Sequence, residues 1–485
     1  MKHELFKVTR TTKKFDPTSK SYRINISYKT ATRITPRTLT VAEAFGLGMD
    51  KTQNQIIYDN LELHISPHDI IYITGESGSG KSVLLKHLEK LLQPNSANIQ
   101  NIKIDKTKPI IETVGKTTEE SLTLLCKVGL NDAFLFLRPY KQLSDGQKYR
   151  YRIAKLIQTQ KQYWIMDEFC STLDRDTAKI VAFNLQKLAR QEGKAILAAT
   201  THTDLQEDLA PNIRIHKRFG KEINIKTPPN KPQENCSVSK HMRIRKGTTT
   251  DYHKLAEFHY RESKRLPPPR KIFAMERTDI NELVGVIVYS YSPPMCFGRS
   301  KALQGRRLKF KELNNQLSII SRVILHPKYR TIGLGAKLVK ETLTLAGTPF
   351  VEAVAVMAKY NPFFEKAGMK KITAQKHDNT YIEAINQLKQ LGFNPHLLAS
   401  KKLNQQKLER LNNHQKTQLR NTLRNIKNPR LQRTLENNPY VDDESYKQAL
   451  EKANSTKLAN MLKTLNILTQ EKIYLFWTAS RQKVF

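Results

Sequence analysis

The sequence predicts an α/β fold with two successive sheet domains and a helical C-terminal region. Its 485 residues are about three times a typical domain length, and 39% of them are hydrophobic, which is enough for buried cores. Short apolar runs alternate with stretches of helical periodicity as far as about residue 373. Beyond that point the pattern is helical and polar, so a sheet domain is not expected there.

Composition shifts along the chain predict four parts. Residues 1–225 form an α/β domain that begins with a basic arm, and residues 226–240 (KTPPNKPQENCSVSK) form a linker, because they are rich in Pro, Asn and Ser and lack apolar periodicity. Residues 241–375 form the second α/β domain, with strands expected at Leu283–Tyr291 and Ser318–His326 and a helix after them. Residues 376–485 form a basic helical tail.

The charge of the chain predicts a polyanionic partner. Lys and Arg number 82 against 44 Asp and Glu, a formal net charge of +38. Nucleic acid is the expected partner, because it offers dense phosphate and because arm, body and tail are all basic. In residues 401–433, Leu and Ile recur at near-helical spacing among Lys, Arg, Asn and Gln. This pattern fits a surface that tracks phosphates, and equally a solvated helical hairpin packed on a core.

Several classes of protein are disfavoured. The four cysteines lie far apart and form no CxxC or Cys/His cluster, which argues against a structural zinc site or a disulfide framework and suits a reducing cytosol. The N-terminus lacks a secretory signal, and no run of about 18 apolar residues occurs. We therefore expect a cytoplasmic protein without membrane insertion.

The first chemical motif follows an apolar strand expected at Ile70–Thr74. The segment from Gly75 to Ser82, GESGSGKS, has the spacing G-x-x-x-x-G-K-[ST] between a strand and a helix, which predicts an ATP-binding phosphate loop. Gly75, Gly78 and Gly80 let backbone N–H groups converge on phosphate oxygens, and the helix N-terminus adds its dipole. Lys81 is expected to reach the β- and γ-phosphates, and the Ser82 hydroxyl to bind Mg²⁺.

The second motif is the strand YWIMDEF, Tyr163 to Phe169, which ends in two carboxylates. Asp167 is placed to hold Mg²⁺, directly or through water, and Glu168 to polarise the attacking water. A surface strand can also end in Asp-Glu, but the phosphate loop upstream favours the catalytic interpretation.

Three further motifs resemble those of ABC-type ATPases. Ser144, Gly146 and Gln147 in LSDGQ resemble the family signature, Ser171–Asp174 resembles its D-loop, and Thr200-Thr201-His202 resembles its switch-histidine strand. The resemblance implies that the signature of one subunit closes the ATP held by another, so we expect a head-to-tail homodimer with His202 at the catalytic site. A soluble ATPase is favoured over a transporter that uses a separate membrane subunit.

Two elements of that family have no obvious counterpart. Only 62 positions separate Lys81 from Leu143, so a trimmed helical subdomain is expected, and no glutamine stands in a Q-loop context. Glu112 is a candidate substitute. Phe45 and Tyr58 are the two candidates for the aromatic residue that stacks on adenine.

The segment from Ser321 to Leu343 resembles the acetyl-CoA-binding part of GNAT acyltransferases. The loop Arg330-Thr331-Ile332-Gly333-Leu334-Gly335 matches [QR]-x-x-G-x-[GA], and AKYNPFFEKAGM resembles the closing motif of that family. The resemblance implies an acetyl-CoA site whose pyrophosphate lies on the loop amides and the helix N-terminus. The residues it implies are Val323, Arg330, Ile332, Gly333, Gly335 and Ala336.

The sequence departs from the GNAT pattern at Phe364, where a tyrosine normally protonates the leaving thiolate. Tyr360, Ser321 or water are the candidate substitutes. His259-Tyr260 resembles the His-Tyr pair of the GNAT-like Mom family of phage DNA modifiers. His259 is therefore a candidate base or metal ligand, and equally a histidine satisfied on a helix face.

The whole order of motifs resembles a family of fused ATPase–acetyltransferases of prokaryotes and their viruses. The first hypothesis is an ATP-driven enzyme that modifies nucleic acid with an acyl-type group. The second is an ATP-gated acetyltransferase of protein or a small amine. The third is a degenerate acyl-CoA-sensing domain on a DNA-binding ATPase.

Overall fold

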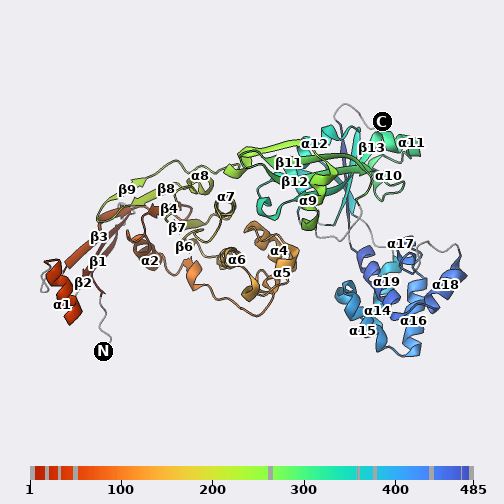
Figure 1. Cartoon of the computed structure of the whole chain (residues 1–485), viewed down its shortest axis with the longest axis horizontal. Helices are drawn as coiled ribbons and strands as arrows, with labels where there is room; N and C mark the ends of the chain where they lie inside the picture. The colour runs from red at the N-terminus through yellow and green to blue at the C-terminus, as the bar shows by residue number, and fades with distance from the viewer. Residues whose placement is uncertain are drawn as a thin grey trace. The chain divides into compact units, whose positions relative to one another are not determined.

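The computed structural model describes residues 6–16, 21–30, 34–46, 53–259, 266–356, 358, 361–374, 379–435, 442–470 and 472–479 (Figure 1). The chain forms two compact units. The first comprises residues 1–264, 272–287 and 323–338, and the second comprises residues 265–271, 288–322 and 339–485.

A six-stranded sheet forms the centre of the first unit. Its strand order is β5-β6-β7-β4-β8-β9, with β5 to β8 parallel and β9 antiparallel to β8. Strands at the positions expected from the sequence are confirmed for β4, β6 and β7. The bounds are β4 (Ile70–Gly75), β5 (Ser96–Asn98), β6 (Tyr163–Met166), β7 (Ala195–Ala199), β8 (Ile213–Lys217) and β9 (Ile223–Lys226).

Both faces of this sheet are covered, and for that reason every residue of β4 is buried. Alternate side chains point to opposite faces. Ile71 and Ile73 pack with helix α2 (Lys81–Leu91) and with the strands of a smaller sheet. Ile70 and Tyr72 pack on the other face with helices α6 (Asp145–Gln158) and α7 (Arg175–Glu192).

The smaller sheet is antiparallel, in the order β1-β2-β3, and is built from the N-terminal arm. Its strands are β1 (Phe6–Asp16), β2 (Ser21–Thr30) and β3 (Gln53–Leu63). Helix α1 (Pro36–Ala44) lies between β2 and β3 in the sequence and begins at a capping box made by Thr35 and Thr38.

The segment between β5 and β6 is helical and short, as expected from the spacing of the motifs. Its helices before α6 are α3 (Ile110–Thr113), α4 (Thr118–Lys127) and α5 (Ala133–Phe136). After β7 comes α8 (Gln206–Leu209), and residues 227–236 between β9 and the second sheet contain neither helix nor strand.

A seven-stranded mixed sheet follows, in the order β10-β11-β12-β13-β14-β16-β15, with β13 and β14 parallel. The strands expected from Leu283 and from Ser318 are confirmed as β12 and β13. The bounds are β10 (Met242–Lys246), β11 (Pro269–Arg277), β12 (Glu282–Tyr291), β13 (Leu317–Leu325), β14 (Phe350–Ala355), β15 (Lys370–Ala374) and β16 (Ile473–Thr478). The helices among them are α9 (Thr249–Leu255), α10 (Arg299–Ala302), α11 (Phe310–Gln316), α12 (Leu334–Leu343) and α13 (Phe363–Lys366).

The strand β16 was not foreseen, because the sequence analysis assigned everything after residue 376 to a helical tail. Its first four residues are buried, and it pairs antiparallel with both β14 and β15. The chain thus returns to the sheet after the helices, through pairing between residues 99 to 128 positions apart.

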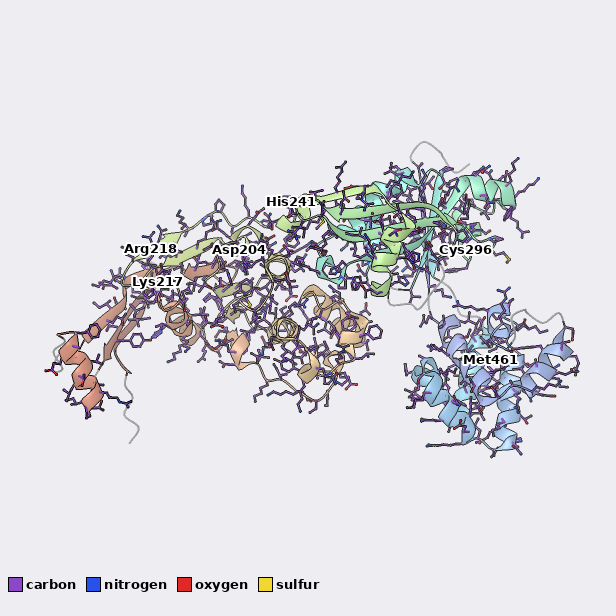
Figure 2. The ribbon with its side chains drawn as sticks, in the orientation of Figure 1. Asp204, Lys217, Arg218, His241, Cys296 and Met461 are labelled. Atoms are coloured by element: carbon purple, nitrogen blue, oxygen red, sulfur yellow. The ribbon has the colours of Figure 1, made fainter. Side chains whose placement is uncertain are left out.

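The helices between β15 and β16 have a core of their own. Residues 401–433 contain seven Leu and Ile, and six of them are buried in this core, Leu403 being the exception. Met461 lies inside this helical body, as Figure 2 shows. Its helices are α14 (Asn379–Gln390), α15 (Lys401–Glu409), α16 (Asn413–Arg424), α17 (Pro429–Gln432), α18 (Asp443–Glu451) and α19 (Ser455–Leu468). Across the described ranges, no helix combines the length and apolarity needed to cross a membrane.

Candidate functional site

Three of the ATPase motifs, the phosphate loop, the carboxylate strand and the switch-histidine strand, meet at one edge of the six-stranded sheet. Strands β6, β7 and β4 are neighbours and parallel, so their carboxyl ends lie at the same edge. The phosphate loop follows β4, Asp167 follows β6 and Thr200 follows β7. The topology therefore gathers residues that are more than 100 positions apart in the sequence.

The phosphate loop requires glycine at its two ends. Gly75 has φ +143°, and a Cβ there would collide with the Lys217 carbonyl. Gly80 has φ +102°, and a Cβ there would lie 2.5 Å from Ile57 Cγ2. Gly78, with φ +79°, also adopts a left-handed conformation that favours glycine. These backbone conformations let the loop close tightly above β4 and enter α2 at Lys81.

Lys81 and Ser79 make the loop suitable for an anion. Lys81 is 8% exposed, and its ammonium donates to the carbonyls of Gly75 at 2.8 Å and Glu76 at 2.6 Å. Burial lowers the pKa of Lys81, while the nearby Asp167 and Glu76 carboxylates act in the opposite direction. The buried Ser79 hydroxyl has no hydrogen-bond partner among the described residues. Phosphate oxygens would satisfy these groups.

Asp167 and Glu168 stand where β6 ends. The half-buried Asp167 carboxylate accepts a hydrogen bond from the Glu168 N–H at 3.0 Å, and the Glu168 side chain is exposed. Glu168 has φ +51°, an uncommon backbone conformation for a residue with a Cβ. The Ser82 hydroxyl and the Asp167 carboxylate are oxygen donors that fit Mg²⁺, which when bound would neutralise phosphate charge.

The backbone around His202 is anchored to the same edge. The Thr200 N–H donates to the Ile73 carbonyl at 3.0 Å, and the His202 N–H donates to the Thr200 hydroxyl at 3.3 Å. The buried Tyr72 hydroxyl donates to the His202 carbonyl at 2.5 Å. These three hydrogen bonds fix the backbone from Thr200 to His202, while His202 itself is half-exposed.

The signature residues begin helix α6. Ser144 and Gln147 form a capping box, in which the Gln147 N–H donates to the Ser144 hydroxyl at 3.4 Å and the Ser144 N–H donates to the Gln147 side chain at 3.0 Å. A Cβ at Gly146 would lie 3.1 Å from Leu173 Cδ2, so the signature packs closely on the D-loop of the same chain. Ser144 is exposed, and a ligand could therefore reach it.

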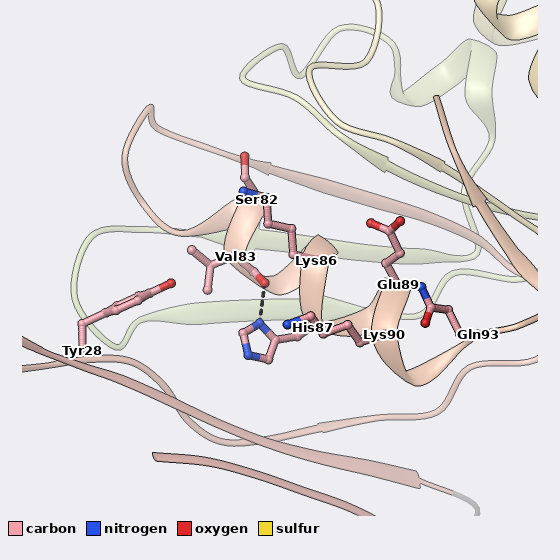
Figure 3. A pocket seen from close by; sticks show the side chains of 8 residues that line it. All are labelled: Tyr28, Ser82, Val83, Lys86, His87, Glu89, Lys90 and Gln93. Carbon is pink, nitrogen blue, oxygen red and sulfur yellow. Dashed lines mark hydrogen bonds between the residues drawn. The ribbon is translucent and has the colours of Figure 1, made fainter. Parts of the chain in front are cut away.

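A cavity of about 320 Å³ lies beside the phosphate loop (Figure 3). It is lined by Tyr28, Ser82, Val83, Lys86, His87, Glu89, Lys90 and Gln93. The aromatic residue at this cavity is Tyr28, which sequence reasoning missed. Of the two candidates proposed from the sequence, Tyr58 is 2% exposed with its hydroxyl donating to the Gly80 carbonyl at 3.0 Å, and Phe45 ends α1 with its side chain exposed. Glu112, the candidate Q-loop residue, is exposed on α3.

The second glycine-rich turn connects β13 to α12. Gly333 has φ +85° with open space where a Cβ would lie, and Gly335 and Ala336 are in the first turn of α12. Val323 is in β13, and Ile332 is buried in the turn.

The Arg330 guanidinium in this turn is bound by backbone carbonyls. It donates to those of Leu325 at 3.1 Å, Asn131 at 2.9 Å and Phe258 at 3.1 Å, all within the first unit. A pyrophosphate at Arg330 would have to replace some of these bonds.

The remaining candidates for transferase chemistry are only partly described. His259 is half-exposed, its N–H donates to the Ala256 carbonyl at 3.1 Å, and the described ranges contain no group of three or more His, Cys, Asp or Glu able to hold a metal. Tyr260 and Tyr360 lie outside the described residues. Phe364 is buried against Phe363, with ring centroids 4.2 Å apart. Ser321 shares a hydrogen bond of 2.8 Å with Ser290.

Comparison with known proteins identifies the first domain. The family model described as ABC transporter matches residues 58–124. Over 182 residues the chain is 30% identical to the cytochrome c biogenesis ATP-binding export protein CcmA of Colwellia psychrerythraea, covering 32% of this chain and 81% of that protein. The CcmA of Reclinomonas americana is 31% identical over 181 residues, covering 31% of this chain and 81% of that protein. The chain belongs to the ABC ATPase family.

The family assignment applies to the N-terminal ~200 residues, which hold the phosphate loop, the carboxylates and the signature. A solved dimeric structure of the ATP-binding cassette MJ0796, bound to ADP and Pi, is 19% identical, covers 36% of this chain and 92% of that one, and gives a TM-score of 0.31. The ABC domain binds and hydrolyses ATP. The relatives and structures described above do not identify the mixed sheet that follows it.

Proposed function

We propose that the chain hydrolyses ATP in sites shared by two copies arranged head to tail, and that this ATPase dimer acts on nucleic acid in the cytoplasm. One observation carries the proposal: the phosphate loop, Asp167–Glu168 and His202 converge on one sheet edge, while the single LSDGQ signature offers an exposed Ser144 at the start of α6. One chain thus supplies one half of each of two shared sites. Lys81, Ser82 and Asp167 would hold the nucleotide and Mg²⁺, Glu168 would polarise the attacking water, and the Tyr28 ring would support the base.

The nucleic-acid part of the proposal is supported by the charge of the helical body, residues 379–468. Residues 401–433 carry ten Lys and Arg against a single acidic residue, Glu409. Because most of the apolar residues of this stretch are buried in a separate core, the cations are left on the outside. Lys427, Arg430 and Arg433 recur at every third position, are exposed and have no ion pair with any described residue. Such a surface suits phosphate better than a hydrophobic partner.

Neutralising these three cations should weaken binding to duplex DNA and reduce its salt dependence. For the triple variant Lys427→Gln, Arg430→Gln, Arg433→Gln, the slope of log affinity against log salt should fall by up to about 2.7, at about 0.9 per phosphate contact. Fluorescence anisotropy with a labelled duplex, repeated at several salt concentrations, measures both quantities.

The matched control is the triple variant Arg218→Gln, Lys221→Gln, Lys240→Gln, which removes the same charge. Each of these cations already pairs with a carboxylate of its own chain: Glu222, Asp59 and Glu207 respectively. An equal loss in both variants would show that net charge alone matters and would contradict a binding surface on the helical body. A wild-type chain that binds no nucleic acid would contradict the nucleic-acid proposal itself.

A second candidate activity is acetyl-CoA-dependent transfer at the mixed sheet, to a nucleic-acid amine or to an amine of a protein or small molecule. It is supported by the parallel pair β13 and β14, whose register runs only from Leu317↔Phe350 to Ile320↔Ala353 although both strands continue. Diverging parallel strands followed by a glycine-rich turn and a helix suit a phosphate-bearing cofactor. The carbonyl bonds of Arg330 count against pyrophosphate binding at this turn, and therefore against acetyl-CoA transfer and acyl-CoA sensing alike.

Substituting Gly333→Glu tests the acetyl-CoA site. A carboxylate in this open turn should repel the pyrophosphate and abolish acetyl-CoA binding measured by calorimetry. Gly305→Glu is a matched control, because Gly305 also has a left-handed φ, +87°, with open space around it. Unchanged acetyl-CoA binding in the Gly333→Glu variant would remove the GNAT assignment, and absence of acetyl-CoA binding in the wild type would do the same.

A further inference from the structure

Two cations from the mixed sheet contact the start of helix α7 in the ABC domain. Arg277 is the last residue of β11, and Lys328 lies in the turn after β13. An Arg277 guanidinium nitrogen lies 2.6 Å from Asp176 Oδ2, and the Lys328 ammonium lies 2.7 Å from the same oxygen and 3.4 Å from Asp174 Oδ1. All four residues belong to the first compact unit.

The contact is mostly shielded from solvent. The side chains of Arg277 and Asp176 are 10% and 17% exposed, and Arg277 also binds Asp279 at 2.8 Å and the Tyr329 hydroxyl at 3.3 Å. Burial alone would raise the pKa of Asp176, but hydrogen bonds from Arg277 and Lys328 bring it below its usual value. Charges with so little exposure are tolerated only when they are paired, so these contacts specify one geometry rather than adding general surface stability.

The start of α7 is connected directly to the catalytic carboxylate. Asp174 caps α7 by accepting from the Thr177 N–H at 3.1 Å, and the D-loop turn that ends at Asp174 begins beside Glu168. The Ser171 N–H donates to the Glu168 carbonyl at 3.1 Å, and the Leu173 N–H donates to the Cys170 carbonyl at 3.3 Å. The far end of this turn is held by the two cations, and its near end carries Glu168 at φ +51°.

We propose that Arg277 and Lys328 are positioning residues for ATP hydrolysis. By holding Asp174 and Asp176, they fix the turn that carries Glu168, so turnover at the phosphate loop depends on the mixed sheet. The inference rests on the proposed function in its assignment of Glu168 as the group that polarises water. It adds a role for two residues that lie outside the ABC motifs and touch neither ATP nor its phosphates.

The test uses the full-length chain with Arg277→Ala, Lys328→Ala and Arg277→Lys. In both alanine variants kcat for ATP should fall about 10-fold or more, because small displacements of a catalytic group are costly. The affinity for ATP should stay within about twofold, since the phosphate loop is untouched. Arg277→Lys should recover part of kcat, because an ammonium can keep one of the lost bonds. Hydrogen exchange at the Ser171 and Leu173 amides should accelerate in the alanine variants.

Arg245→Ala is the matched control. Arg245 lies in β10 of the same sheet and pairs with Asp251 at 3.0 Å and Glu276 at 2.6 Å, so its removal breaks two ion pairs without touching α7. We expect its kcat to match the wild type. An equal fall of kcat in Arg245→Ala would mean that general weakening of the sheet is responsible, which would overturn the proposal.

Unchanged kcat in both alanine variants would also overturn the proposal. If Arg277→Ala fails to fold, Lys328→Ala decides, because Lys328 is 25% exposed and its loss leaves Asp176 paired with Arg277. If the wild-type chain hydrolyses no ATP, the proposed function fails, and the role of Arg277 and Lys328 in hydrolysis fails with it. The exchange rates of the Ser171 and Leu173 amides then decide only the structural part of the inference: faster exchange in the alanine variants supports a turn held by the two cations, and unchanged exchange overturns it.

Discussion

Glu168→Gln should lower ATP turnover by at least about 100-fold, the usual contribution of a positioned general base, while ATP binding is preserved. The amide has nearly the shape of the carboxylate but cannot accept the proton of the attacking water. Because the Glu168 side chain is exposed at the end of β6, the substitution should not disturb the sheet. ATP then stays bound, and the two chains that enclose it should stay paired.

Light scattering with saturating ATP and Mg²⁺ measures the pairing, and phosphate release measures the turnover. Glu192→Gln is the control, since Glu192 ends α7, at the opposite end from the catalytic turn. A Glu168→Gln chain that remains monomeric under these conditions would contradict the head-to-tail site. Turnover equal to that of the wild type would contradict the role of Glu168.

The phosphate loop could be predicted from sequence because its chemistry is local. Gly75 and Gly80 are required because the loop backbone has a positive φ at both positions. The apolar strand before the loop and the helix after it are adjacent to it in the sequence. The same holds for the strand that precedes Asp167. That these motifs share one edge follows from the parallel order of β6, β7 and β4, which the structure provides and the local patterns do not.

Features that depend on pairing between distant segments could not be predicted. Tyr28 lies in a strand of the basic arm, and nothing in its neighbours signals that the arm folds over α2 to form one wall of a cavity. The sequence analysis assigned the apolar run of β16 to the helical tail. Its partner strands β14 and β15 precede the whole helical body, so no partner strand lies near β16 in the sequence. The motif around Arg330 was interpreted only as an anion site, because the carbonyl of Asn131 that binds its guanidinium lies 199 positions away.

Lys81→Ala should abolish ATP binding. In the structure the Lys81 ammonium is held in the loop by the carbonyls of Gly75 and Glu76, at the place where phosphate oxygens would arrive. Charge-assisted hydrogen bonds of this kind contribute about 1.5–3 kcal/mol each, so losing the contacts to two phosphates should weaken binding by at least about 100-fold. In a thermal melt, added ATP should raise the Tm of the wild type, because it binds only the folded state, and should leave that of the variant unchanged.

Lys155→Ala separates this loss from the general cost of deleting a lysine that donates to a backbone carbonyl. Lys155 lies in α6 and likewise donates to a backbone carbonyl, that of Thr113, at 2.7 Å. Without nucleotide both variants should melt below the wild type, because each leaves a carbonyl without its charged donor. With ATP, only Lys155→Ala should recover stability. An ATP-dependent rise in Tm for Lys81→Ala equal to that of the wild type would mean that the phosphates are held by backbone N–H groups alone, and the role assigned to Lys81 would be wrong.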